Sequence, residues 1–463
     1  MANNAFLKFF KEPKAIEPLT DQQEIDRRYR QFRWRVFYSL YIGYAVSYIG
    51  RKNITVVLTN IENTFKISNV TLGFVLSAFY VAYGIGKFVN GILADKANVR
   101  TFFSTGLVMA AVCTLACSFI FTLSFISTTV LLLLLYFFWG ATGWFHSMLF
   151  PPIAKSMSYW YTKKERGLKW SIISTSHQIG AASCLIITNA AISIFHDWKA
   201  AFYGPALITL LVGIWQFNRL RDKPESIGLP EIEKYKNDSD APAEELIEER
   251  KEEQPKNKSS HMQVIIKNIL LNPLVWILVI SYLFVYVIKS ASEDWMIKYF
   301  IQARGNFALN ASFKTIFMQI VGAGGTIMAG VISDRFFKGK RAPVNIFFLL
   351  GLVFSLILLL IDPIKTTVLD YTYVALIGFF VSGLQNLVGL HIVEICCKEV
   401  ASAANGFAGM VSYVGAIVAS VGTGLALDLF GWSGAISFWI ISTILAILLI
   451  LSVIPLEKKL KKA

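Results

Sequence analysis

The sequence predicts an all-α membrane protein in which twelve transmembrane helices form two pseudo-symmetric six-helix bundles. Of its 463 residues, 55% are hydrophobic and only 16% are charged, a composition outside the usual range of soluble domains. A run of roughly 20 apolar residues can cross a bilayer as a helix, and about twelve such runs are present. They lie near residues 34–60, 70–94, 101–124, 127–157, 167–195, 199–219, 270–300, 308–333, 342–362, 368–396, 402–427 and 431–455.

Positive charge is distributed unevenly along the chain, and this distribution predicts the orientation in the membrane. Lysine and arginine are frequent before the first apolar run, after the second, fourth and eighth runs, and at the C-terminus, whereas residues 125–129 contain none. Short loops rich in these residues remain in the cytoplasm, so both termini are expected there. The net charge of +14 is therefore interpreted as a topology signal, and no nucleic-acid partner is expected.

A polar segment divides the apolar runs six and six. Residues 221–265 mix both signs of charge with proline and have no apolar face, which is typical of a linker. The expected organisation is a cytoplasmic N-terminal segment (1–33), a first bundle (34–220), a cytoplasmic linker (221–265), a second bundle (266–456) and a basic cytoplasmic tail (457–463).

Two short patterns recur between the halves. The pattern Gly-x3-Asp followed by a basic residue occurs at Gly91–Lys96 and again at Gly330–Arg335, at an offset of 239 residues. Two tyrosines and a cation occur at Tyr44–Arg51 and again at Tyr282–Lys289, at an offset of 238. Because the offsets are nearly equal and the matches fall in corresponding helices, the halves are predicted to be structural repeats.

Two adjacent cations interrupt the first apolar run. Arg51 lies about 24 Å along the helix from Arg35, and a charge at the centre of a membrane helix costs roughly 2.5–3.5 kcal/mol. One interpretation is that Arg51 and Lys52 extend to the membrane surface or pair locally. The other is a binding site, because Tyr41, Tyr44, Tyr48 and Arg51 are spaced 3, 4 and 3 apart and share one helix face. Lys52 points about 100° away, so a structural role is expected for it.

Further cations lie at similar depth in other apolar runs. Pseudo-symmetry places Lys289 opposite Arg51, Lys87 follows Tyr80 and Tyr83 on the second run, and His177 lies in the middle of the fifth. A lone membrane histidine is usually a hydrogen-bonded core residue, but three cations directed at one cavity favour a binding role here.

Acidic residues that could neutralise these cations are few. Glu293 and Asp294 follow Lys289 but are expected to lie towards the opposite membrane surface from the termini, so the cavity is predicted to be net positive. Arginine binds phosphate with two parallel hydrogen bonds, lysine acts as a point charge, and tyrosine donates neutral hydrogen bonds. This combination suits an anion with hydroxyl groups, and it does not suit proton-coupled drug export, which would need a buried carboxylate.

The loop sequence Gly91–Arg100 resembles a motif of the major facilitator superfamily. Longer stretches are similar to one branch of it, the organophosphate:phosphate antiporters. These stretches are RRYRQFRWRVFYSLYIGYAVSYIGRKN, AYGIGKFVNGILADKANVR, YWYTKKERG, RDKPESIGLPEIEKYKND, NPLVWILVISYLFVYVIKSASEDW and GFAGMVSYVGA. The resemblance spans nearly the whole chain and implies a substrate cavity between the bundles near the midplane of a bacterial inner membrane.

The resemblance also implies roles for individual residues. Arg51 and Lys289 would bind the phosphate, with Lys87 and His177 beside them. The remaining cavity lining would comprise Tyr44, Tyr48, Tyr83, Tyr286, Tyr413, Gln319 and His146, and the gating loops would contain Asp95, Arg100, Asp334 and Arg335. The chain departs from the family pattern at Lys289 (usually Arg), Ile173 (Trp), Gln319 (Glu), His146 (Gln), Leu149 (Gly) and Phe150.

The function implied is import of a phosphorylated metabolite, hexose 6-phosphate such as glucose 6-phosphate, in exchange for inorganic phosphate. The alternatives are a glycerol-3-phosphate:phosphate antiporter, a membrane sugar-phosphate sensor with little transport, and a proton-coupled carrier of another anion. The sequence contains neither a nucleotide-binding GxxxxGK[ST] motif nor a metal-ligand spacing, so we expect no catalytic residue, no cofactor and no enzymatic activity. A self-contained set of twelve helices favours a monomer.

Overall fold

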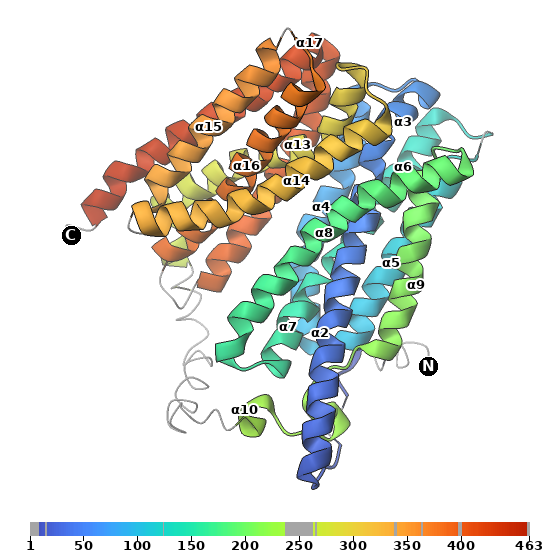
Figure 1. Ribbon diagram of the computed structural model, residues 1–463, viewed down its shortest axis with the longest axis vertical. Helices are drawn as coiled ribbons and strands as arrows, with labels where there is room; N and C mark the ends of the chain where they lie inside the picture. Colours follow the sequence, from blue (N-terminus) through green and yellow to red (C-terminus); the bar gives the residue numbers. More distant parts are fainter. Residues whose placement is uncertain are drawn as a thin grey trace.

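The computed structural model describes residues 9–13, 16–123, 125–236, 263, 266–337, 340–362, 364–396 and 401–460, and these residues are almost entirely helical (Figure 1). The first half contains α2 (Gln22–Lys52), η1 (Asn53–Val56), α3 (Leu58–Phe65), α4 (Asn69–Lys96), α5 (Val99–Ile120), α6 (Thr128–Ser147), α7 (Phe150–Trp160), α8 (Lys163–Phe195), α9 (Ala200–Arg219), η2 (Pro224–Ile227) and α10 (Ile232–Tyr235). The second half contains η3 (Ile266–Leu270), α13 (Pro273–Gln302), α14 (Ala308–Val331), η4 (Ile332–Phe336), α15 (Arg341–Ile361), α16 (Thr367–Ile395) and α17 (Ala401–Leu460).

The predicted all-α membrane fold is confirmed. Within the described residues, ten helices are long and apolar enough to cross a membrane. Helix α2 is not among them, because its tyrosines and cations lower its mean hydropathy. The long α17 is two helices joined at Gly431, whose φ of 65° and ψ of −164° form a conformation essentially restricted to glycine. Counting α2 and both arms of α17 gives the twelve predicted segments.

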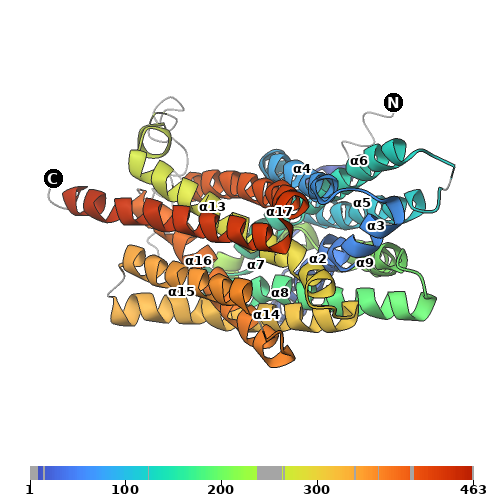
Figure 2. The ribbon, with the colours of Figure 1, turned by 90° about the horizontal axis from the view of Figure 1, so that it is seen from above.

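The helices pack as two groups, which lie side by side in Figure 2. In the first half, α4 packs on α6, α5 on α6 and α9, and α2 on α8 and α9. In the second half, α13 packs on α17, α14 on α16, and α15 on both α16 and α17. The halves meet mainly through α4 with α17 and α8 with α14.

Part of the predicted linker is folded onto the first half. Leu229 and Ile232 are buried, the Tyr29 hydroxyl donates to the Pro230 carbonyl, and the Tyr29 and Tyr235 rings stack at 3.9 Å. Residues 221–236 therefore cover the first turns of α2. Residues 237–262 of the predicted linker lie outside the described part of the chain.

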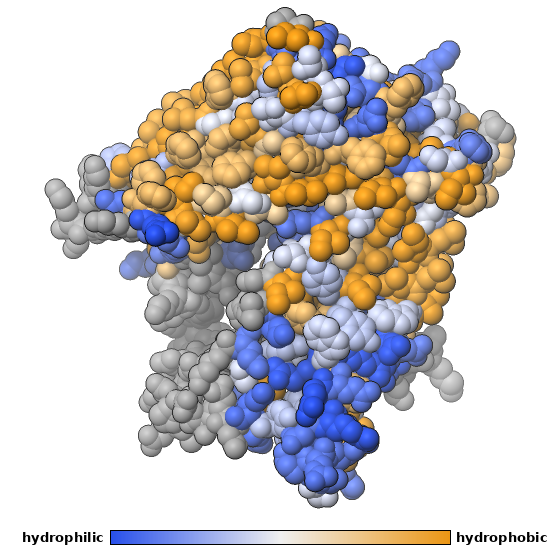
Figure 3. Space-filling view, viewed as in Figure 1, coloured by the Kyte–Doolittle hydropathy of each residue, from blue (hydrophilic) through white to orange (hydrophobic). Residues whose placement is uncertain are grey.

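The two halves are closed against each other at one end of the molecule. We call this the distal end; it carries α3, and the opposite, terminal end carries the first turns of α2 and α10 (Figure 1). The terminal end is strongly polar over α2, whereas an apolar band covers the helices above it (Figure 3). This band is the surface expected to face lipid.

Small residues allow α4 and α17 to touch at the distal end. A Cβ added to Gly73 would overlap the Ser420 carbonyl, and one added to Gly424 would overlap the Asn69 carbonyl. Since lipid tails are as apolar as leucine, helices in a membrane associate through such close packing and not through hydrophobic burial.

Polar contacts complete the distal closure. The Asp428 carboxylate of α17 accepts hydrogen bonds from the backbone amides of Asn69 (3.0 Å) and Val70 (2.8 Å) at the start of α4. It thereby caps the positive end of a helix in the other half. Lys298 of α13 bonds to Asn69 and forms an ion pair with Glu62 at 3.0 Å.

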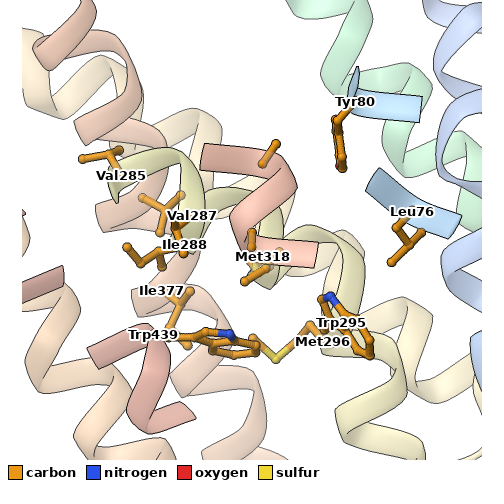
Figure 4. Close-up of a cluster of buried hydrophobic side chains, with 14 of the residues drawn as sticks. Leu76, Tyr80, Val285, Val287, Ile288, Trp295, Met296, Met318, Ile377 and Trp439 are labelled. Carbon is orange, nitrogen blue, oxygen red and sulfur yellow. The ribbon is translucent and has the colours of Figure 1, made fainter. Parts of the chain in front are cut away.

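A shared apolar core lies beside these contacts. Figure 4 shows Leu76 and Tyr80 of α4 opposite Trp295 of α13, with Met296 and Trp439 deeper in the second half. Trp295, Met296 and Trp439 are completely buried. The core is thus continuous across both halves near the distal end.

Replacing Gly424 by valine should separate α4 from α17 and shift the protein towards distal opening, because the new side chain overlaps the Asn69 carbonyl. Thr64 and Phe307 are both exposed at the distal end. Double electron–electron resonance between spin labels at these two positions should give a longer distance in the variant than in the wild-type protein. Gly324→Val is the matched control, since a Cβ there meets nothing within 4 Å. An unchanged distance in Gly424→Val would contradict this view of the closure.

Candidate anion-binding site

Arg51 lies in the last turn of α2 and is surrounded by aromatic rings. Its guanidinium carbon is 5.2 Å from the Tyr48 ring centroid, 5.1 Å from Phe79 and 4.7 Å from Tyr83, and it donates a hydrogen bond to the Tyr413 hydroxyl of the other half. Its buried Nε has no hydrogen-bond partner. No ion pair joins Arg51 to a carboxylate within the described residues, so its charge is left without a partner of opposite sign.

The other predicted phosphate-binding residues lie around the same tyrosines. Lys289 Nζ is 5.2 Å from the Tyr286 ring, Lys87 Nζ is 5.7 Å from the Tyr413 ring, and the His177 ring is 5.6 Å from that of Tyr48. Together with Arg51, these three residues come from α2, α4, α8 and α13. The structure therefore brings together basic residues that are far apart in the sequence.

Tyrosine rings connect the two halves of the site. Tyr413 of α17 lies 4.9 Å from Tyr83 of α4 and 6.2 Å from Tyr286 of α13, measured between ring centroids. Tyr44 lies 5.5 Å from Tyr48 on α2. All five tyrosines predicted from the sequence thus belong to one group, which supplies several neutral hydrogen-bonding hydroxyls beside the cations.

Glu293 lies towards the distal end from Lys289, as expected from the sequence, but its ion pairs with the cations were not predicted. Its carboxylate is 3.4 Å from Lys289 and 3.0 Å from Lys52. The spacing of four residues between Lys289 and Glu293 is that of an ion pair on one helix face, and this signal could have identified the contact. Glu293 thus partly neutralises two of the cations.

Lys52 has the structural role expected for it. Only 8% exposed, it donates to Asp294 of the other half at 2.7 Å. Tyr80 donates to the second oxygen of Asp294 at 2.6 Å. Arg51 therefore has no acidic partner among the described residues, whereas the adjacent Lys52 has two.

His146 does not line the cluster as predicted. It is 4% exposed, and its ring nitrogens lie 2.8 Å from the carbonyl oxygens of Thr142 and Ser47. Since both nitrogens face backbone, His146 fastens α6 to α2 behind Arg51. Gln319 is partly exposed on α14, and no hydrogen bond between described residues joins it to the cluster.

The residues predicted for the gating loops lie at the terminal end. Arg100 is in the first turn of α5, and the side chain of Asp95 lies outside the described part of the chain. Asp334 forms an ion pair with Arg341 at 2.6 Å, and Arg341 also bonds to Glu394 at 2.9 Å. Arg335 is exposed beside them.

The site keeps an excess of positive charge. Among the described residues, two carboxylates form ion pairs with the cations of the site, which are Arg51, Lys52, Lys87 and Lys289, and both carboxylates contact Lys52. Electrostatic interactions are stronger here than in water because the surroundings are of low polarity. An anion with two negative charges would balance the excess.

The contacts that join the two halves lie mainly on one side of the site. Apart from the bond between Arg51 and Tyr413, the hydrogen bonds and ion pairs that join described residues of the two halves lie on the distal side of Arg51. The Lys289 side chain is 22% exposed. The two halves are therefore closed against each other on the distal side of the site.

Comparison with known sequences agrees with the fold. Residues 40–420 match the Major Facilitator Superfamily. A probable hexose phosphate transport protein of Chlamydia trachomatis is 34% identical over 97% of this chain and 96% of its own length. A glycerol-3-phosphate transporter of Bacillus subtilis is 31% identical over 95% of this chain and 96% of its own length. The membrane sensor protein UhpC of Escherichia coli is 32% identical over 97% of this chain and 98% of its own length.

The fold is also found among solved structures. An inward-facing, occupied bacterial homologue of the human lysosomal transporter Spinster aligns with a TM-score of 0.70 over 92% of this chain and 97% of its own. The sequence identity is 14%, so this likeness concerns the fold alone.

Asp294→Ala should lower the free energy of unfolding by about 3 kcal/mol, because it leaves Lys52 buried with only one carboxylate. The double variant Lys52→Met/Asp294→Leu should recover most of that loss, since it removes both buried charges. Thermal unfolding in detergent measures both. Asp334→Ala is the control, because its carboxylate is 68% exposed and an exposed pair contributes about 0–1 kcal/mol. Equal effects of Asp294→Ala and Asp334→Ala would contradict the buried-pair interpretation.

Proposed function

The chain belongs to the Major Facilitator Superfamily and, within it, to the organophosphate:phosphate antiporter family, and we propose that it imports a phosphorylated metabolite in exchange for inorganic phosphate. The observation that carries the proposal is the charge of Arg51, which has no carboxylate partner among the described residues and faces a group of tyrosines shared by both halves. A phosphate monoester carries close to two negative charges at neutral pH. It matches both the excess charge and the hydroxyl groups of the site.

Transport would proceed by alternating access. The halves would rock about the anion site, so that the distal contacts break as contacts at the terminal end form. With the site empty, reorientation would carry unneutralised cations through a medium of low polarity, which is costly. A bound dianion lowers that cost, and for this reason the cycle would be an obligate exchange.

Exchange requires no cofactor and no catalytic residue in this proposal. The opposing gradient of inorganic phosphate drives import, and the protein acts as a transporter and not as an enzyme. We place both termini in the cytoplasm of a bacterial cell, with the protein in the inner membrane as a monomer, because the basic loops lie at the terminal end. The distal contacts then lie on the side of the site away from the cytoplasm.

The first candidate substrate is hexose 6-phosphate, such as glucose 6-phosphate. It is supported by the identity with the probable hexose phosphate transport protein of Chlamydia trachomatis. Glycerol 3-phosphate is the second candidate, supported by the Bacillus subtilis relative. A sensor that binds sugar phosphate with little transport is the alternative from another class, and its support is the 32% identity with UhpC.

A counterflow experiment separates these candidates. Proteoliposomes loaded with inorganic phosphate are offered radiolabelled glucose 6-phosphate, glycerol 3-phosphate or phosphate, with and without an imposed pH gradient. We expect uptake of glucose 6-phosphate that depends on internal phosphate and not on the pH gradient. Binding without uptake of any ester would support the sensor, and uptake driven by the pH gradient would support a proton-coupled carrier.

Arg51→Ala and Lys289→Ala should each reduce phosphate exchange by on the order of 100-fold or more, since each removes charge-assisted hydrogen bonds that contribute roughly 1.5–3 kcal/mol apiece. Lys289→Arg should retain exchange, because it keeps the charge and adds the paired geometry usual in the family. Initial rates of labelled phosphate exchange measure these effects. Lys267→Ala, at an exposed position of η3, is the control. Undiminished exchange in Arg51→Ala would exclude that residue from the site.

A further inference from the structure

A second group of arginines lies at the terminal end, outside the candidate anion site. A groove of about 670 Å³ runs between the first half of α2 and the end of α9. The side chains used below are Arg27, Arg30, Arg35 and Arg219, together with Trp34 and Tyr38. Arg35 and Arg51 are both on α2 but about 24 Å apart along the helix, so the groove and the anion site are separate.

The groove has more positive charge than its acidic neighbours neutralise. Arg27 pairs with Glu24 at 2.6 Å, and Asp26, the acidic residue of the lining, accepts a hydrogen bond from Gln22 at 3.1 Å. Arg30, Arg35 and Arg219 form no ion pair within the described residues. Three guanidinium groups in one groove therefore lack carboxylate partners.

Arg35 has a buried donor that no described residue accepts. One terminal nitrogen donates to the Asn218 carbonyl of α9, but its Nε is buried and has no hydrogen-bond partner. A buried donor without a partner costs free energy that a bound acceptor would recover. Nearby, burial and the charges of Arg35 and Arg100 lower the pKa of Arg221, which is consistent with uncompensated positive charge around the groove.

The surroundings of the groove are those of a membrane interface. Trp34 is 61% exposed, and the Tyr38 ring lies 6.1 Å from that of Trp215, over which Arg219 is placed at 5.6 Å. Exposed tryptophan and tyrosine rings are typical of the headgroup level of a bilayer. The α9 surface that continues from Arg219 into the membrane is apolar and exposed. Its residues include Leu207, Leu211 and Ile214.

We propose that this groove binds the headgroup of an anionic phospholipid. Arg30, Arg35 and Arg219 would contact the phosphate oxygens, and the acyl chains would lie along the exposed apolar face of α9. A lipid fits better than free phosphate because the cations and the apolar face adjoin each other, and only an amphiphile satisfies both. A basic groove beside membrane helices is a known type of site for such headgroups.

Native mass spectrometry of the purified protein tests the proposal. The protein in detergent is titrated with dioleoyl phosphatidylglycerol or with dioleoyl phosphatidylcholine, which has the same acyl chains and no net charge. The double variant Arg30→Gln/Arg219→Gln removes two exposed cations of the groove and leaves the partly buried Arg35 in place. Lys267→Gln/Lys340→Gln removes two exposed cations at the same end of the second half and is the matched control.

We expect the wild-type protein and the control to prefer phosphatidylglycerol, and the groove variant to lose on the order of tenfold in affinity for it. Binding of phosphatidylcholine should not change. Unaltered phosphatidylglycerol binding in a groove variant that unfolds at the wild-type temperature would overturn the proposal. Displacement of the lipid by millimolar inorganic phosphate alone would overturn it too, because it would identify a site for a soluble anion.

Discussion

The rest of the structure depends on one guanidinium group that lies inside the membrane without a carboxylate partner among the described residues. Contacts of Arg51 with aromatic rings at about 5 Å contribute roughly 0.5–2 kcal/mol each and offset part of the cost of placing the charge there. In the proposed function, a bound anion supplies the remainder. Because both halves build the site, binding of the anion would then be coupled to the arrangement of the halves.

The charge of the adjacent Lys52, unlike that of Arg51, is neutralised by carboxylates. Its two carboxylates lie on α13 of the other half, so its pairing holds the halves together on the distal side of the site. Glu293 contacts both Lys52 and Lys289. Under the proposed function, an anion that draws Lys289 away from Glu293 would also change the closure, and the shared carboxylate would link ligand binding to the distal contacts.

Most of the fold and part of the site could be predicted from local patterns. Hydropathy located the membrane segments, and the spacing of Tyr44, Tyr48 and Arg51 placed them on one helix face, as the structure has them. The contact of Glu293 was missed although its spacing from Lys289 is a recognisable pair. His146 was assigned to the cavity by resemblance, and its actual contacts with two backbone carbonyls depend on how closely α6 packs against α2.

The sequence by itself determined which segments span the membrane, which side chains share a helix face and which end of the molecule carries the basic loops. These properties depend on neighbours within a few turns of one helix. Only the tertiary structure decided which charges acquire partners. Asp428 caps the first turn of α4 across 358 residues of sequence, and Asp294 pairs with Lys52 across 242. No local pattern encodes such contacts, because they exist only where two separately formed bundles meet.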